Sequence, residues 1–583
     1  MTVISDTLTR VTTMEELRTK GRMVVHVSDR PIALFLEEGR VYAVDNRCPH
    51  MGFPLHRGSV SDGILTCHWH HARFDLCSGG TFDRWADDVR TYPAEVQGDG
   101  AIYLDLSAMP DRRAHHRKRL RDGLEQGLDL VLAKSVIALM DKGADSGQPF
   151  EIGLLFGAKH RDAGWGQGLT MHTALMNMLP QLAPSDRPLA LYHGLSAVAR
   201  DCAGRPPRFP IEALPEGDAD MPTLKRWFRR FVEVRDSEGA ERCIASAVRA
   251  GAASAQVADM LFAAGTDHRY IQIGHALDFT NKALEALDVA GWEHAEPVLT
   301  SLARGYAVAT RMEESNAWRH PVDLVELLER AFERLPEAVE HGKGSPRARL
   351  SRRELATVLL GDDPKASIEA LLDALSKGSS SEEVAESVVY AAALRIARFS
   401  TSNEFGDWDT VLHTFTFANA VYQGMRRSPS PELLRGVLDA AMSVYLDRFL
   451  NVPPAPLPTL PADTALNPTG LLAGLPELLS RRQQVNEAGE LVGSYLAGGG
   501  EPTRVVAALG AALLREDRDF HTIQCVEAAF RVHESLCGTE EGAHVLIAAA
   551  RYLAAHAATP RAQLQTYLIA DRLHRGERLY EEG

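Results

Sequence analysis

The sequence contains few cysteines, few aromatic residues and no excess of positive charge. Its 583 residues include 7 cysteines, an odd number spread along the chain, which argues against a disulfide scaffold and indicates a reducing compartment. The net charge of −15 argues against a nucleic-acid partner. No run of 18 uncharged apolar residues is present, and residues 1–6 lack the basic and apolar regions of a secretory signal. We therefore expect a cytoplasmic protein without a membrane span.

The remaining composition is ordinary for a globular protein, and the length predicts several domains. Residues 22–106 contain short β-branched and aromatic runs bounded by turn residues, which predicts strands. From about residue 120 onward, apolar residues recur at helical spacing and alanine is abundant. We predict a small all-β domain over 1–107, a linker and first helix over 108–150, and a large all-α, repeat-like domain over 151–583, with candidate lobes at 151–345 and 346–583.

A basic run over residues 112–121 follows the predicted strands. It has two interpretations, a docking surface for an acidic partner or a solvated linker that starts a helix. Its composition favours the linker.

Four residues of the β-rich part form two short metal-ligand motifs. Cys48 and His50 are separated by one residue, and after 16 further residues Cys67 and His70 are separated by two. Two thiolates and two imidazoles are the ligands of a Rieske [2Fe–2S] cluster. The same set also suits tetrahedral zinc. The strand-rich surroundings and glycine-containing turns favour the cluster over zinc.

With these motifs, residues 10–107 resemble the Rieske domains of bacterial ring-hydroxylating oxygenases and their ferredoxins. The resemblance implies that Cys48, His50, Cys67 and His70 hold a [2Fe–2S] cluster that relays electrons from a reductase or ferredoxin. The family usually has glycine after the second histidine, where this chain has His71. The extra cysteine of high-potential relatives is absent, which implies a potential near the negative end of roughly −150 to +300 mV.

The helical region repeats a histidine near the start of an apolar segment. Four such segments, 168–175, 271–281, 409–419 and 518–524, carry one histidine each at this position. His193 is a further buried-looking histidine, and His268 lies seven residues before His275, on the same helix face. Each alone suits a hydrogen-bonded core position, but a cluster must pass its electrons somewhere. We therefore predict a mononuclear non-haem iron held by a subset of six histidines, which are His172, His275, His413, His193, His268 and His521. The first three of these are assigned as catalytic.

The helical part distantly resembles the questin oxidase-like proteins, a family of oxidative enzymes that act on aromatic compounds. Residues 268–275 resemble a His-Pro-x-Ile-His-Leu-Gly-Tyr run, and residues 413–416 a His-x-x-Thr run. The family histidine falls on Gln272 and its tyrosine on His275. Lys282 lies on the same helix face as His275, and we expect it to extend to solvent, with a lysine carbamate ligand as the alternative.

These observations predict an oxidoreductase. The cluster would pass electrons to the helical iron for O₂-dependent oxidation of a small organic substrate, with an aromatic compound as a candidate. The alternative of a different class is an electron-transfer or scaffold protein whose only redox centre is the cluster and whose helices bind a partner. Hydrolytic zinc or manganese chemistry is a weaker third reading. The oxygenase resemblance also implies a homo-oligomer as a candidate assembly.

Overall fold

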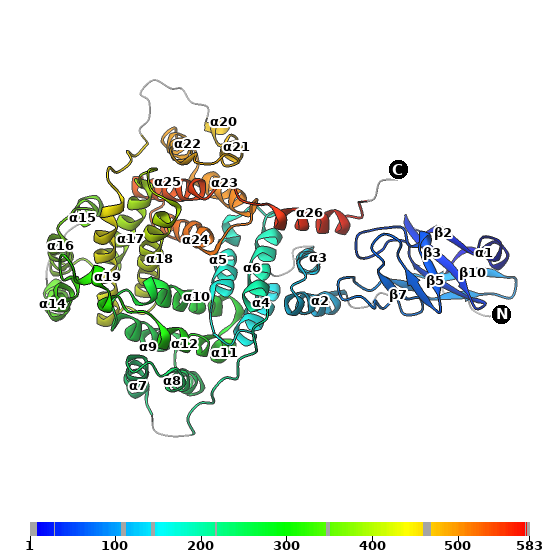
Figure 1. The fold of residues 1–583 in the computed structure, drawn as a ribbon, viewed down its shortest axis with the longest axis horizontal. Helices are drawn as coiled ribbons and strands as arrows, with labels where there is room; N and C mark the ends of the chain where they lie inside the picture. Colours follow the sequence, from blue (N-terminus) through cyan, green and yellow to red (C-terminus); the bar gives the residue numbers. More distant parts are fainter. Residues whose placement is uncertain are drawn as a thin grey trace. The chain divides into compact units, whose positions relative to one another are not determined.

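The computed structural model describes residues 8–27, 29–106, 112–141, 146–215, 219–344, 350–458, 468–577 and 579. The chain forms two compact units, which Figure 1 shows as a strand-rich part and a helical part. Unit 1 comprises Met1–Asp145 and Gln565–Gly583, and unit 2 comprises Ser146–Leu564. The predicted fold class, a small β domain followed by a large helical region, is confirmed. Unit 2 begins at Ser146, where the sequence analysis expected the helical domain from 151, and residues 108–145, expected as a linker and first helix, belong to unit 1. The division of the helical domain into two lobes stays a prediction.

Three antiparallel sheets build the β part of unit 1. Their strand orders are β1-β10-β9, β2-β3-β4-β8 and β5-β6-β7. The strands and the short helices among them are β1 (Leu8–Thr13), α1 (Met14–Lys20), β2 (Arg22–Val27), β3 (Arg30–Glu37), β4 (Arg40–Asp45), η1 (Leu55–Arg57), β5 (Ser59–Ser61), β6 (Ile64–Thr66), β7 (Arg73–Asp75), β8 (Thr91–Tyr92), β9 (Ala94–Val96) and β10 (Ala101–Asp105).

The central strand β3 contributes to two hydrophobic cores. Successive side chains of a strand point to opposite faces, so Ile32 and Leu34 join one core while Ala33 and Phe35 join the other. The second core also contains the buried Cys48 and Cys67, although neither cysteine lies in a strand. The sheet thus supports the two loops that carry the predicted cluster ligands.

Unit 1 also contains helices that the sequence analysis placed outside the β domain. These are α2 (Arg112–Gln126), α3 (Asp129–Met140) and the part of α26 (Ala562–His574) that begins at Gln565. The basic run of residues 112–121 is therefore part of α2, in agreement with the helix start favoured above.

The described part of unit 2 is helical. Its elements are α4 (Gly147–Lys159), α5 (Gln167–Met178), η3 (Leu179–Gln181), α6 (Arg187–Cys202), α7 (Met221–Glu233), α8 (Ser237–Arg249), α9 (Ser254–Thr266), η4 (Ile271–Gly274), α10 (His275–Ala290), η5 (Trp292–His294), α11 (Ala295–Thr300), α12 (Ala303–Val308), η6 (Met312–Glu314), α13 (Asn316–Arg319), α14 (Leu324–Gly344), α15 (Arg352–Leu359), α16 (Pro364–Ser376), α17 (Ser381–Ala397), α18 (Phe405–Arg427), α19 (Pro431–Leu446), η7 (Asp447–Leu450), α20 (Pro468–Leu472), α21 (Leu475–Leu478), α22 (Val485–Ala497), α23 (Pro502–Leu514), α24 (Phe520–Ser535) and α25 (Glu540–Ala555).

Side chains define the starts of the two helices that carry His413 and His521. The carboxylate of Asp519 accepts the backbone N–H of Thr522 at 2.8 Å and caps α24. At the start of α18 the side chain of Asp407 accepts the backbone N–H of Glu404 at 3.0 Å. Helix α18 packs against α10 and α24, and α5 packs against the same two helices. Across the described residues, we find no helix with both the length and the apolar character that a membrane crossing requires.

Candidate functional site

The two predicted cluster loops share one backbone pattern. The N–H of Cys48 donates to the carbonyl of Phe53 at 2.8 Å, and the N–H of Cys67 donates to the carbonyl of Ala72 at the same distance. In each loop the fifth residue, counted from the cysteine, has a left-handed backbone: Gly52 with φ of 83° and His71 with φ of 62°. Glycine adopts this conformation readily, whereas histidine does so at a cost.

The four predicted ligands come together as two pairs. The thiols of Cys48 and Cys67 contact each other, and this contact, helped by the backbone N–H groups of Trp69 and His70, lowers the pKa of Cys67 to about 6. The same contact raises the pKa of Cys48, as expected when two thiols share one proton. The rings of His50 and His70 lie 4.9 Å apart.

A pair of thiols beside a pair of imidazoles fits a cluster in which each iron takes one pair. A single zinc ion would require all four donor atoms around one point, but within the described part of the chain only the group His275, His413 and His521 brings three donors within 4.8 Å of one another. In addition, Nδ1 of His50 is buried without a hydrogen-bond partner in the structure, as a nitrogen reserved for a metal would be. These residues fit a [2Fe–2S] cluster.

The two histidines have different surroundings. The ring of His50 is partly buried and meets the ring of Trp85 edge-on at 4.5 Å, whereas His70 is exposed. Burial, the charge of Lys134 and the neighbouring His70 lower the pKa of His50 to about 4. The neutral imidazole, which is the form that binds iron, is therefore the stable form at neutral pH.

In unit 2 the structure brings together three of the six predicted histidines. The donor nitrogens of His275, His413 and His521 all lie within 4.8 Å of one another. Nε2 of His413 and Nε2 of His521 are 3.1 Å apart, and the ring of His275 lies 4.7 Å from that of His413. The three residues come from α10, α18 and α24 and are partly exposed. We call them the histidine triad.

Two members of the histidine triad, His275 and His413, are uncharged at neutral pH. Burial, followed by the charges of His413 and His521, lowers the pKa of His275 to about 3. Burial and His521 lower the pKa of His413 to about 4. Metal ions bind the neutral imidazole, so protons compete weakly for these two nitrogens above pH 5.

An unusual backbone segment places His275 at the first position of α10. Tyr270, Gln272 and Ile273 have φ values of 43°, 54° and 54°, followed by Gly274 at 87°. Such angles are disfavoured for a β-branched residue like Ile273. Backbone strain of this kind tends to persist where the surrounding structure uses it to position a functional group.

A carboxylate that the sequence analysis did not single out lies beside the triad. Oδ2 of Asp409 is 3.7 Å from Nδ1 of His521, and its Oδ1 accepts the hydroxyl of Tyr552 at 2.7 Å. Burial favours the protonated acid, but hydrogen bonds from His556 and Tyr552 together with the charge of His521 hold the pKa of Asp409 below its ordinary value. Asp409 precedes His413 by one helical turn, and this i,i+4 spacing was the signal available in the sequence.

Two of the remaining predicted ligands occupy buried positions with contacts of their own. Nε2 of His172 lies 3.0 Å from the carbonyl of Phe150, and the ring stacks on the Phe150 ring. For His193, the Gln563 amide nitrogen lies 2.8 Å from Nδ1 when that amide is oriented to donate. Neither belongs to the triad, so we leave both out of the proposed metal site.

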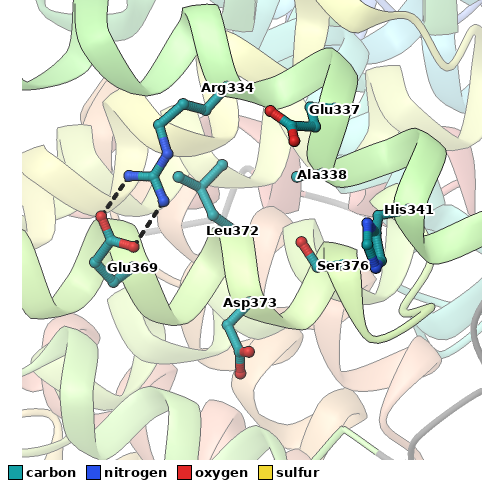
Figure 2. Close-up of a pocket in the computed structure, with 8 residues that line it drawn as sticks. All are labelled: Arg334, Glu337, Ala338, His341, Glu369, Leu372, Asp373 and Ser376. Atoms are coloured by element: carbon teal, nitrogen blue, oxygen red, sulfur yellow. Dashed lines mark hydrogen bonds and ion pairs between the residues drawn. The ribbon is translucent and has the colours of Figure 1, made fainter.

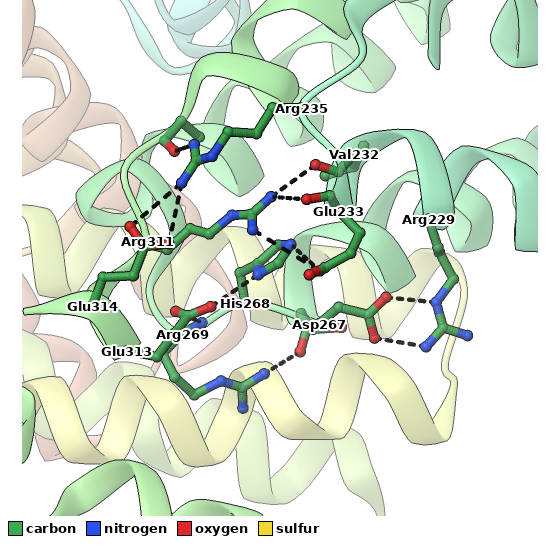
Figure 3. Close-up of polar contacts among 12 residues, drawn as sticks. Arg229, Val232, Glu233, Arg235, Asp267, His268, Arg269, Arg311, Glu313 and Glu314 are labelled. Atoms are coloured by element: carbon green, nitrogen blue, oxygen red, sulfur yellow. Dashed lines mark hydrogen bonds and ion pairs between the residues drawn. The ribbon is translucent and has the colours of Figure 1, made fainter. Parts of the chain in front are cut away.

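The third, His268, is held between carboxylates. Figure 3 shows its ring between Glu313, 2.9 Å from Nδ1, and Glu233, 3.4 Å from Nε2. Arg311 donates to the carbonyls of Val232 and Glu233 in the same cluster. Both nitrogens of His268 are thus engaged in linking α7, η6 and the end of α9.

Lys282 does not reach solvent, so that expectation is wrong. Its side chain is 1% exposed, and its Nζ lies 2.9 Å from Glu285 and 2.7 Å from Glu527. Two carboxylates compensate the buried charge, and this makes burial tolerable. Asn177 donates to the same two glutamates at 2.7 and 2.9 Å.

Nearer the histidines along α10, Asp278 is 2% exposed and accepts a hydrogen bond from the Gln524 amide. Burial raises the pKa of Asp278 to about 7, against the opposing effects of Lys282 and Gln524. Asp278 and Gln524 each follow a triad histidine by three residues, so a buried polar layer lies one turn from the triad.

A shallow hollow of about 430 Å³ lies between α14 and α16, where Arg334 pairs with Glu369 (Figure 2). Its lining includes no predicted site residue. Asp373 in its lining pairs with Lys377, and we assign the hollow no role.

Comparison with known proteins identifies the N-terminal part. The Rieske [2Fe-2S] domain model matches residues 7–93. The 3-phenylpropionate/cinnamic acid dioxygenase ferredoxin subunit of Photorhabdus laumondii is 39% identical over 100 residues, which is 17% of this chain and 92% of the relative. The naphthalene 1,2-dioxygenase ferredoxin component of Pseudomonas aeruginosa is 32% identical over 84 residues, 14% of this chain and 80% of the relative.

A longer relative has the same kind of match. The 4beta-methylsterol monooxygenase of Methylococcus capsulatus is 43% identical over 100 residues, covering 15% of this chain and 27% of that enzyme. The family match ends at residue 93, so the resemblance of the helical part to questin oxidase-like proteins stays a prediction. Through its N-terminal domain, which spans most of the length of the ferredoxin relatives, the chain belongs to the Rieske [2Fe-2S] family.

Proposed function

We propose that the protein is an oxidoreductase in which the Rieske domain delivers electrons to an iron ion held by the histidine triad, for the O₂-dependent oxidation of an organic substrate. The observation that carries the proposal is the convergence of His275, His413 and His521 from three separate helices to within 4.8 Å. A Rieske domain in the same chain supplies a reason for a redox-active metal there.

Cys48, Cys67, His50 and His70 would hold the cluster. When bound, the cluster supplies one-electron transfer. The buried thiols exclude water from one side of the site, while the exposed His70 leaves an edge open to an electron donor such as a reductase or ferredoxin.

The triad has the properties of an iron site with open positions. Imidazoles are ligands that suit iron, and three protein ligands leave coordination positions for O₂ or substrate. Asp409 lies 3.7 Å from Nδ1 of His521 and is itself held by Tyr552. Such outer partners fix the ring that binds the metal. Phe279 and Phe520, whose rings lie 5.3 and 5.4 Å from that of His275, give the triad an apolar side.

Metal content per chain, measured on anaerobically purified protein together with EPR of the reduced sample, tests this proposal. We expect close to three irons and one Rieske signal in the wild type. His413→Ala and His275→Ala should each reduce the iron content by one while the Rieske signal stays unchanged. His294→Ala, which removes a histidine paired with Glu151 instead, is the matched control.

Two irons per fully loaded chain, with no other metal, would overturn the iron site and favour an electron carrier or scaffold. Zinc in place of the third iron would overturn the oxidative reaction. The substrate assignment and a homo-oligomeric assembly are further parts of the proposal, and turnover measured against protein concentration tests the latter.

A further inference from the structure

Helices α2 and α3 follow the family-matched segment and contact the first cluster loop. Nζ of Lys134 in α3 donates to the carbonyls of Pro49 at 2.6 Å and His50 at 2.7 Å. These are backbone groups of the loop that carries two predicted ligands. The Lys134 side chain is 14% exposed, so little water screens its charge.

Arg119 in α2 bonds to the backbone on both sides of Trp85, whose ring packs against His50. It donates to the carbonyls of Arg84 at 3.0 Å and Ala86 at 3.1 Å, on either side of Trp85. The ring of Trp85 meets the ring of His50 at 4.5 Å. Arg119 therefore holds the backbone on both sides of the tryptophan whose ring packs against this ligand.

One carboxylate joins the two cations. Asp87 lies 2.7 Å from Arg119 and 3.7 Å from Lys134. Arg119 also pairs with Asp122 at 3.2 Å, whereas the carboxylate paired with Lys134 is that of Asp87. Because Asp87 already has a close partner in Arg119, the charge of Lys134 is only partly compensated.

We propose that Lys134 is a positioning residue that holds the loop of Cys48 and His50 and raises the reduction potential of the cluster. Reduction adds one electron to the cluster, and a poorly screened positive charge nearby stabilises the added negative charge. Lys134 lies outside the segment matched by the family, residues 7–93. The inference depends on the Rieske domain alone and does not require a metal at the histidine triad.

The test is an EPR-monitored redox titration of the full-length, cluster-loaded protein. Lys134→Met keeps the aliphatic stem but removes the charge and donors, and we expect a more negative midpoint potential and faster cluster loss. Lys134→Arg should restore the potential toward that of the wild type. Lys118→Met in α2, which removes a 75% exposed lysine, is the control and should leave it unchanged.

Asp87→Asn gives a prediction of opposite sign. Removing the carboxylate leaves the charge of Lys134 less compensated, so the midpoint potential should become more positive. A role in folding alone would not shift the potential in opposite directions. Equal potentials for the wild type, Lys134→Met and Asp87→Asn would overturn the proposal. If Lys134→Met retains no cluster, its midpoint potential cannot be measured. In that case the proposal is overturned when Asp87→Asn shows no positive shift of the midpoint potential.

Discussion

At the scale of single residues, the backbone of the second cluster loop is unusual. His71 has the left-handed conformation that Gly52 adopts at the equivalent place in the first loop. A non-glycine residue pays about 1–2 kcal/mol for this conformation. The side chain of His71 is exposed and is not one of the four cluster ligands described above.

We therefore expect His71→Gly to stabilise the cluster-loaded protein. Relief of strain outweighs the larger entropy loss of glycine, which is about 0.5–1 kcal/mol, so the net gain should be roughly 0.5–1 kcal/mol. Chemical denaturation followed at the cluster absorbance measures it. His68→Gly, at an exposed position of the same loop without positive φ, should give no gain. A loss of stability in His71→Gly would show that the histidine makes a favourable contact.

The sequence alone was enough to predict the cluster ligands, but it could not show which histidines form the triad. Cys48 and His50 are neighbours along the chain, as are Cys67 and His70, so their spacing alone predicts two clamps. The triad joins His413 to His521, which are 108 residues apart. Which histidines meet depends on how three helices pack, and helical periodicity does not specify this. For the same reason the sequence did not separate the triad from His172, His193 and His268.

At the scale of helices, a buried ion cluster connects α10 with α24. Lys282 on α10 neutralises Glu285 on its own helix and Glu527 on α24. Periodicity correctly placed Lys282 on the helix face of His275, but it could not show that carboxylates face it there. The acid from α24 comes from 245 residues away.

Lys282→Met should destabilise unit 2 strongly, because two buried carboxylates would lose the lysine that they share, and Arg531, 3.3 Å from Glu285, compensates only one of them. Removal of one member of a buried ion pair typically costs about 3–5 kcal/mol. Circular dichroism during urea unfolding measures the helical transition. Lys377→Met removes a 62% exposed lysine paired with Asp373 and should change stability by less than about 1 kcal/mol. Equal effects of the two substitutions would contradict the interpretation.

The buried Asp278 predicts how helical stability depends on pH. Burial raises its pKa from 3.8 to about 7, so the folded state keeps a proton that the unfolded state has already lost. Its stabilising effect is complete below pH 4 and is lost as the pH rises through 7. Between these values one such group lowers the free energy of unfolding by up to about 1.4 kcal/mol per pH unit.

Urea unfolding at several pH values, for the wild type and Asp278→Asn, measures this contribution. The neutral amide has no proton to lose, so the curve of the variant should fall less steeply between pH 4 and pH 7. Parallel curves for the two proteins would mean that Asp278 titrates at its ordinary pKa.

At the scale of the whole molecule, unit 1 is discontinuous in sequence. Arg47, next to the first cluster cysteine, donates to the carbonyl of Leu573 at 3.1 Å and to that of Glu577. A Cβ atom at Gly52 would lie 3.2 Å from the Leu573 side chain. This contact could not be predicted from the sequence, since a helical pattern near residue 565 carries no information about a partner 526 residues away.

Deletion of residues 565–583 should therefore weaken the cluster site while leaving the fold of unit 2. We expect cluster absorbance to decay several-fold faster in air than in the full chain, with little change in helical circular dichroism. A deletion of residues 578–583 keeps both carbonyl acceptors of Arg47 and should decay at the wild-type rate. Equal decay in both deletions would contradict a role for the contact.

The contact of Arg47 with Leu573 also has a consequence for biosynthesis. At about 5–20 residues per second, the ribosome adds Leu573 roughly 30–100 s after Arg47, because 526 residues separate them. Throughout that interval the nascent first loop lacks its C-terminal contacts. Cluster assembly factors would meet an incompletely supported loop during synthesis and a fully supported one only after it, so lasting cluster insertion is coupled to completion of the helical unit.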